Sequence, residues 1–148
     1  PVKQARAYIQ SYLASYPDVA AYLKDIVAEA HAKGYVTTLF GRRRYIPEIS
    51  GHNAVQRKFG ERVAMNSPIQ GSAADIVKIA MLGVSRRIAS EGLDAKLILQ
   101  VHDELIVEAS KKDADRAAAI LREEMEGAVK LSVPLTVDLS IGERWYGM

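Results

Sequence analysis

The sequence contains no cysteine, which excludes disulfide bonds and thiolate metal sites and suits a reducing compartment. It also has no apolar run of about 18 residues and no basic-then-apolar amino terminus, so we expect neither a membrane span nor a secretory signal. Internal repeats, low-complexity tracts and glycine-rich phosphate loops are missing too. We therefore expect an ordinary globular domain, and 148 residues suffice for one compact core.

The basic residues are unevenly distributed, although the whole chain carries a net charge of only +2. Residues 1–62 hold ten Lys and Arg against five Asp and Glu, a balance of +5. Residues 63–110 hold four against six, and residues 111–148 hold six against seven, so both later parts are slightly acidic. A basic amino-terminal part suits a polyanion lying against it.

Apolar residues at helical spacing predict two helices before residue 35. The first ends near Pro17, and the second is closed by Gly34 as a left-handed cap. A tyrosine stripe at the same spacing predicts core or half-buried packing, and a base-stacking platform is the alternative. Its members are Tyr8, Tyr12, Tyr16 and Tyr22.

A short β-hairpin is predicted from residues 35–40 and 44–47 because of their β-branched and aromatic content. Arg42, Arg43 and Arg44 crowd this hairpin. Three adjacent arginines repel one another unless they are solvated or face phosphates. Phosphate binding and a solvated edge that resists aggregation are therefore both open.

A helix is predicted at residues 54–65, and a longer and strongly patterned helix at residues 68–91. Ser67 fits the cap before the longer helix, with Pro68 in its first position and Gln70 three residues after the cap. That arrangement is a capping box with its preferred proline. A capping role alone accounts for Ser67 and Gln70, so any binding role for Gln70 needs separate support.

Two more elements are predicted in the carboxy-terminal part. Residues 112–130 form a helix with an alanine-rich buried face and a charged, solvated face. Residues 134–139 alternate apolar and polar side chains after a proline, which predicts a strand with one covered face. Trp145 and Tyr146 are expected to pack back on the body.

Residues 96–108 form two short apolar runs around a polar break, which predicts a β-hairpin. His102 and Asp103 lack the glycine or asparagine that a relaxed two-residue turn prefers. Such a mismatch between residues and turn suggests function. Carboxylates at the tip, Asp103 and Glu104, suit a divalent cation near a phosphate chain, and an ordinary polar turn is the alternative.

Four ordered motifs carry a resemblance through essentially the whole chain. The motifs are Gly34–Leu39, Gly41–Pro47, Glu61–Asp75 and Gln100–Leu105, and the similarity continues to Tyr146. Through them the sequence closely resembles the carboxy-terminal part of the bacterial DNA polymerase I family, the family A DNA polymerases. Several motifs in order at matching spacing are far more specific than one.

The resemblance implies catalytic roles at the 96–108 hairpin, which is motif C of the polymerase palm. Asp103 would bind catalytic Mg²⁺, Glu104 would support the metal site, and His102 would lie near the primer terminus. The reaction is in-line attack of the primer 3′ hydroxyl on the α-phosphate of a nucleotide, assisted by two divalent ions. Primer-template DNA is the implied partner, and Arg57, Arg62, Asn66 and Gln70 match DNA-contacting positions.

The family's active site also needs a second aspartate and a nucleotide-binding fingers helix, and neither precedes Pro1. Pro1 and Val2 lead straight into helical periodicity without a starting methionine. We therefore expect a fragment that is inactive alone and partners with the rest of a polymerase chain, which would hold the incoming dNTP. Exposed apolar patches left by the missing half would favour self-association.

The predicted fold class is α+β, a small antiparallel sheet of the 96–108 hairpin and the 134–139 strand packed by long helices. Residues 1–66 would be the fingers-side helices and arginine-rich hairpin, and residues 67–148 the palm half. The implied location is the bacterial cytoplasm, at the nucleoid and off the membrane.

Two other functions are weighed. Single-subunit RNA polymerases share the palm hairpin but have a serine where Glu104 stands, which favours the DNA enzyme. A non-catalytic nucleic-acid-binding module of polymerase descent is the alternative from another class, and the missing upstream aspartate favours it.

Overall fold

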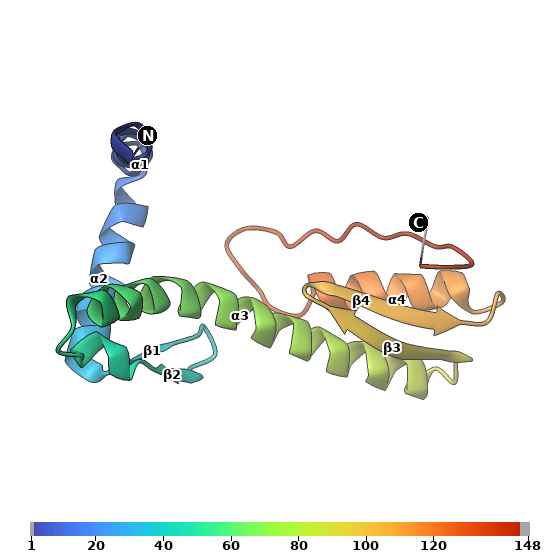
Figure 1. Ribbon diagram of the computed structural model, residues 1–148. Helices are drawn as coiled ribbons and strands as arrows, with labels where there is room; N and C mark the ends of the chain where they lie inside the picture. The colour runs from blue at the N-terminus through green and yellow to red at the C-terminus, as the bar shows by residue number, and fades with distance from the viewer. Residues whose placement is uncertain (1, 146–148) are drawn as a thin grey trace. The chain divides into compact units, whose positions relative to one another are not determined.

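The computed structural model describes residues 2–145, which fall into two compact units with the boundary between Ser72 and Ala73. We call them unit 1 and unit 2. The predicted α+β class is confirmed, because the described residues contain four α-helices and two separate two-stranded antiparallel sheets (Figure 1). Within this part of the chain, no helix is both long and apolar enough to cross a membrane.

Unit 1 begins with two helices, α1 (Val2–Ser15) and α2 (Pro17–Lys33), which meet at a steep angle at Tyr16 (Figure 1). Gly34 ends α2 in the left-handed conformation, with φ of 76°, as the sequence predicts. The hairpin of β1 (Tyr35–Thr37) and β2 (Arg43–Tyr45) follows, and a short 3₁₀ turn, η1 (Pro47–Ser50), leads to α3 (Ala54–Ser90). The core lies between these elements and contains Ile26, Ala30, Val36, Ile46, Ile49 and Ala64.

The tyrosine stripe is exposed in unit 1, so the prediction of core or half-buried packing was wrong for it. Tyr8, Tyr12, Tyr16 and Tyr22 are 68%, 57%, 54% and 41% exposed, and α1 has no buried residue. Helical spacing of apolar residues identified the helix correctly, but spacing alone does not say that a partner covers the apolar face.

The break predicted at residues 66 and 67 is absent, because α3 runs without interruption through Pro68. The capping box is therefore wrong: Ser67 and Gln70 lie in the body of a helix and have no helix start to cap. Proline usually interrupts a helix because it lacks an N–H and its ring crowds the preceding turn. Here Pro68 is itself buried and Ala64, one turn earlier, is fully buried, so tertiary packing overrides the local preference.

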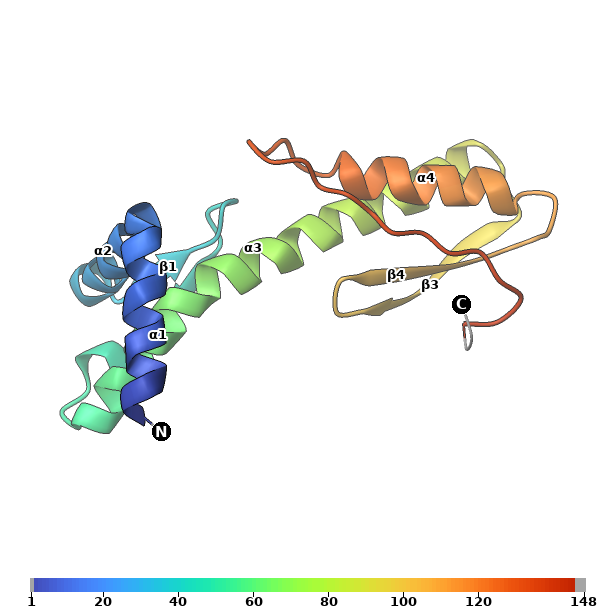
Figure 2. The ribbon, with the colours of Figure 1, turned by 90° about the horizontal axis from the view of Figure 1, so that it is seen from above.

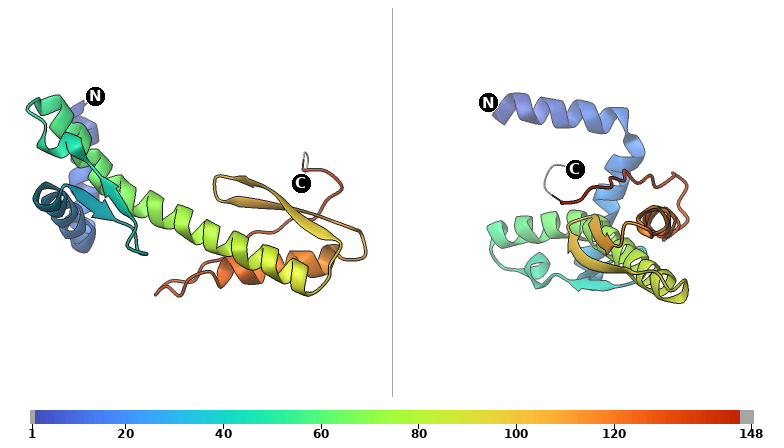
Figure 3. Two further views of the ribbon diagram at one scale, coloured as in Figure 1. Left: turned by 90° about the horizontal axis from the view of Figure 1, so that it is seen from below. Right: turned by 90° about the vertical axis from the view of Figure 1, so that its right-hand side faces the viewer.

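Unit 2 contains the end of α3, the hairpin of β3 (Ala95–Val101) and β4 (Glu104–Ala109), and α4 (Ala114–Glu126). The turn of the β3–β4 hairpin stands at the free end of the ribbon, opposite its connections to α3 and α4 (Figures 2 and 3). The core of the unit contains Ala80, Val84, Ile88, Leu105, Ala117 and Ile120.

The strand predicted at residues 134–139 does not form, which corrects the three-stranded sheet. Side chains in this segment do alternate between half-buried and exposed, with Leu135, Val137 and Leu139 on the covered side. The backbone has no sheet partner among the described residues, and the Val137 N–H donates instead to Glu126 Oε1 at 3.0 Å. The pattern predicted which side chains are covered but could not supply a neighbouring strand. Trp145 is 55% exposed, and Tyr146 lies outside the described residues.

Candidate functional site

The β3–β4 turn of unit 2 places His102 and Asp103 between paired residues Val101 and Glu104. His102 has a φ of 55°, and it is the one non-glycine residue of the described chain with a positive φ. In this left-handed region of backbone conformation, a residue with a side chain is less stable than glycine by about 1–3 kcal/mol. Backbone strain of this kind is concentrated at functional sites. The mismatch that the sequence predicts between these residues and a relaxed turn is therefore present in the backbone of His102.

Two features of the hairpin hold this turn. Gln100 Nε2 donates a hydrogen bond of 2.6 Å to the carbonyl of His102. The register also shifts between Leu97 and Leu99, which leaves Ile98 as an extra residue in β3. A bulge of this kind increases the local twist and re-aims the residues beyond it. The turn is thus fixed from inside the hairpin rather than by a relaxed turn sequence.

Asp103 and Glu104 are adjacent in sequence, and both are exposed at this turn. Their carboxylate oxygens are the kind of ligand that Mg²⁺ takes. Among the residues that the structure describes, however, no group of three or more metal-ligating side chains is assembled. The donors fit the ion in kind, and they make up only part of a site.

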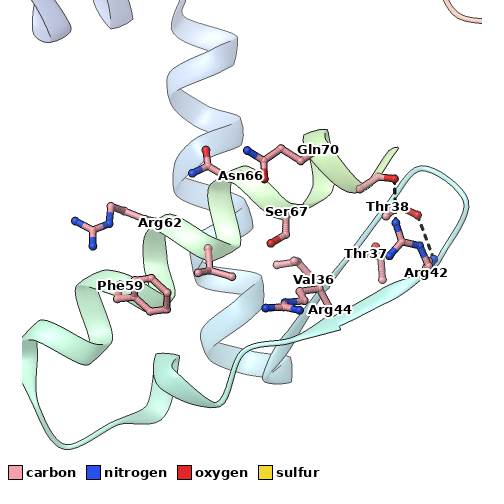
Figure 4. Close-up of a pocket in the computed structure, with 12 residues that line it drawn as sticks. Val36, Thr37, Thr38, Arg42, Arg44, Phe59, Arg62, Asn66, Ser67 and Gln70 are labelled. Carbon is pink, nitrogen blue, oxygen red and sulfur yellow. Dashed lines mark hydrogen bonds between the residues drawn. The ribbon is translucent and has the colours of Figure 1, made fainter. Parts of the chain in front are cut away.

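The second group of predicted residues lies in unit 1, along one side of α3. Phe59, Arg62, Asn66 and Gln70 recur at intervals of three and four, so one continuous helix places them in a row. Figure 4 shows Arg62, Asn66 and Gln70 following one another along the helix. A break at Ser67 would have lost this alignment, so the uninterrupted α3 is what brings these residues together.

The row borders a cavity of about 510 Å³ between α3 and the β1–β2 hairpin. Arg62, Asn66 and Gln70 line it from the helix, and Arg42 and Arg44 line it from the hairpin. The Arg62 guanidinium lies 5.9 Å from the centre of the Phe59 ring, a cation–π contact that orients it. Three arginines around one cavity suit phosphate groups, and two amides beside them suit the edges of bases.

Arg57 does not belong to this row. It lies two residues before Phe59, so it points to a different side of α3. Its guanidinium donates to the carbonyls of Gly51 and His52 at 3.0 and 2.9 Å. This arrangement holds the loop before α3, and a DNA contact by Arg57 remains a prediction.

A set of anchoring residues was missed in the sequence. Ser72 is buried, and its hydroxyl accepts from the Leu39 N–H at 2.9 Å while it donates to the carbonyl of Pro68. Arg42 Nη2 donates to the Gly71 carbonyl at 3.1 Å. These bonds attach the end of the β1–β2 hairpin to α3. Since they join residues about thirty positions apart, no local sequence pattern indicated them.

Comparisons with known proteins concern the whole chain rather than these two groups of residues. The chain matches the family model described as DNA polymerase family A over residues 1–147. DNA polymerase I of Geobacillus stearothermophilus is 54% identical to it over 144 residues, and DNA polymerase I of Pseudomonas aeruginosa is 48% identical over 143 residues. Each alignment covers 97% of this chain and 16% of the relative, so the chain spans about a sixth of these relatives.

A solved structure is similar as well. It is the POL domain of Pol1 from M. smegmatis, in complex with DNA primer-template and dNTP. Its TM-score is 0.87 at 42% sequence identity, and the match covers 91% of this chain and 24% of that chain.

Proposed function

Since the chain belongs to DNA polymerase family A, we propose that it supplies part of the active site of a DNA-directed DNA polymerase that acts in replication or repair. The observation that carries this proposal is the β3–β4 turn, where a left-handed His102 precedes two exposed, adjacent carboxylates. In its bacterial host we place the polymerase in the cytoplasm, at the nucleoid.

In this proposal Asp103 and Glu104 would hold catalytic Mg²⁺, and the remaining oxygen ligands would come from outside this chain. Bound there, the ion would supply a lowered pKa for the attacking hydroxyl and stabilisation of the charge on the leaving pyrophosphate. The chain's own part is positioning: the bulged hairpin and the Gln100 hydrogen bond hold the carboxylates at a fixed point. His102 lies beside the primer terminus in this scheme.

The α3 row is proposed to bind primer-template DNA. Arg62, already oriented by Phe59, neutralises a backbone phosphate, while Asn66 and Gln70 reach the edges of bases. Gln70 is exposed in the body of α3, so no capping role competes with this contact. Arg57 is included as a further phosphate contact at the amino-terminal end of the helix.

A non-catalytic nucleic-acid-binding module is the second candidate. The observation that favours it is the lack of a complete cluster of metal ligands among the described residues. Both candidates bind DNA with an affinity that falls as salt rises. They differ in whether nucleotide incorporation appears once the missing ligands and the nucleotide-binding helix are supplied.

The test mixes this chain with the upstream remainder of the Geobacillus stearothermophilus polymerase, primer-template, Mg²⁺ and one dNTP. We expect no extension from either piece alone and single-nucleotide extension from the mixture. If the pieces demonstrably associate and bind DNA but never extend the primer, the binding module replaces the polymerase proposal. Extension by this chain alone would contradict the expected inactivity.

A further inference from the structure

The β1–β2 hairpin has a second face, opposite the cavity, that the proposed function does not use. In its register Tyr35 pairs with Tyr45, Val36 with Arg44 and Thr37 with Arg43. Side chains alternate between the two faces of a strand. Val36 is buried and Arg44 lines the cavity, so the register places Tyr35, Thr37, Arg43 and Tyr45 on the other face, and of these four only Thr37 also borders the cavity.

The side chains of Tyr35, Arg43 and Tyr45 form one cluster. The rings of Tyr35 and Tyr45 lie 5.5 Å apart, tilted by 59°, and the Arg43 guanidinium lies 4.8 Å from the centre of the Tyr35 ring. Tyr45 nevertheless remains 63% exposed. At this end of β2 the residue that packs in the core is the next one, the fully buried Ile46. Core packing therefore does not explain why Tyr45 is aromatic.

We propose that the Tyr35, Arg43 and Tyr45 face is a stacking platform for unpaired bases of single-stranded DNA. Aromatic rings interleaved with arginine are the surface on which bases stack without sequence preference. The distribution of charge favours a negatively charged ligand on unit 1. Residues 1–72 hold ten Lys and Arg against five Asp and Glu, whereas residues 73–148 hold ten Lys and Arg against thirteen Asp and Glu. The β1–β2 hairpin thus presents the arginine-lined cavity on one face and the cluster of Tyr35, Arg43 and Tyr45 on the other.

The inference deepens the proposed function, because a polymerase template has an unpaired strand beyond its duplex. It concerns different side chains from the α3 row, which is assigned to the duplex. The two assignments can therefore fail separately.

The experiment measures binding of the full 148-residue chain to fluorescent oligothymidylate and to an abasic oligonucleotide of equal length and charge. We expect Tyr45→Ala to weaken oligothymidylate binding about tenfold, the order of one lost base stack, and to leave abasic binding unchanged. Tyr45→Phe retains the ring and should retain binding. The matched control is Tyr16→Ala, which removes another exposed tyrosine of unit 1 from a ring pair, here with Tyr12 at 4.9 Å.

Four outcomes would overturn the inference. Unchanged binding by Tyr45→Ala removes the platform, and an equal loss on both oligonucleotides means that only phosphates are bound. If Tyr16→Ala weakens oligothymidylate binding as much as Tyr45→Ala does, any exposed tyrosine stacks on bases and the hairpin face is not a special platform. Displacement of oligothymidylate by polyglutamate of the same charge means that the face takes acidic chains in general. Weakened duplex binding by Arg62→Ala, measured in parallel, keeps the proposed duplex contact even if the platform fails.

Discussion

At the scale of single residues, His102 combines a backbone that favours glycine with a position beside two carboxylates. Its φ of 55° lies in the left-handed region. We expect His102→Val to lower the free energy of unfolding by about 1–2 kcal/mol, because a β-branched side chain fits this region poorly. His102→Gly should be neutral or stabilising by up to about 1 kcal/mol, because glycine relaxes the strain at an entropic cost. Urea unfolding measures both, and equal losses from the two variants would contradict a strained turn.

Replacing Gln70 distinguishes the two roles that the sequence leaves open for it, helix capping and DNA binding. In the body of α3 its replacement by alanine removes no cap, so Gln70→Ala should leave the free energy of unfolding within about 0.5 kcal/mol. A capping residue would cost about 1 kcal/mol. The same variant should weaken primer-template binding, whereas Gln10→Ala, in an exposed part of α1, should not. Unchanged DNA binding would remove Gln70 from the proposed interface.

At the scale of elements, the attachment of the β1–β2 hairpin to α3 depends on Ser72. Its hydroxyl bridges the Leu39 N–H and the Pro68 carbonyl. We expect Ser72→Ala to lower the free energy of unfolding by about 1–3 kcal/mol, because a donor and an acceptor lose their partner in a buried place. Ser85→Ala, in an exposed part of the same helix, should cost less than about 0.5 kcal/mol. Similar values for both would show that the bridge contributes little.

An ion-pair network joins the end of α3 to α4 in unit 2. Arg116 binds Glu91 through two hydrogen bonds of 2.6 and 2.7 Å, and Arg87 contacts Glu91, Glu123 and Glu124. The Arg116 guanidinium lowers the pKa of Glu91 below its usual 4.5. A carboxyl with a lowered pKa stabilises the folded state above its usual pKa, and this contribution disappears as the pH falls through the lowered value.

We therefore expect the urea midpoint to fall more steeply below pH 4.5 for the unmodified chain than for Glu91→Gln. Because these groups are exposed, high salt should reduce the difference. Glu108→Gln, which alters an exposed carboxyl of β4, is the matched control and should follow the unmodified chain. Identical pH profiles for all three would mean that the network adds nothing to folding.

The errors at this scale share one cause. Ser67, Pro68 and Gln70 have the local chemistry of a helix start, yet the buried surroundings of Pro68 keep the helix continuous. The 134–139 segment has the alternation of a strand, yet the described residues offer it no partner. Local sequence predicts side-chain faces and turn residues well. It does not contain the tertiary packing or the neighbouring strand that decides the outcome.

At the scale of the whole molecule, the sequence predicted the class of fold, the helix that ends at Gly34 and the hairpin with His102 and Asp103 at its turn. It also identified Arg62, Asn66 and Gln70, which α3 places in one row. It did not predict the role of Ser72 or the two faces of the β1–β2 ribbon, since these depend on contacts between distant residues. The roles of the predicted residues in catalysis and DNA binding stay predictions.

The central claim is that Asp103 belongs to a polymerase active site. The measurement is single-turnover primer extension by the Geobacillus stearothermophilus polymerase with this chain replacing its matching segment, which is 54% identical. Asp103→Asn should slow extension by about a thousandfold or more, since several kcal/mol of transition-state stabilisation are lost, while primer-template binding persists. Asp138→Asn, which changes an exposed carboxyl of the same unit, should extend at the unmodified rate. Extension by Asp103→Asn at the rate of Asp138→Asn would contradict the account.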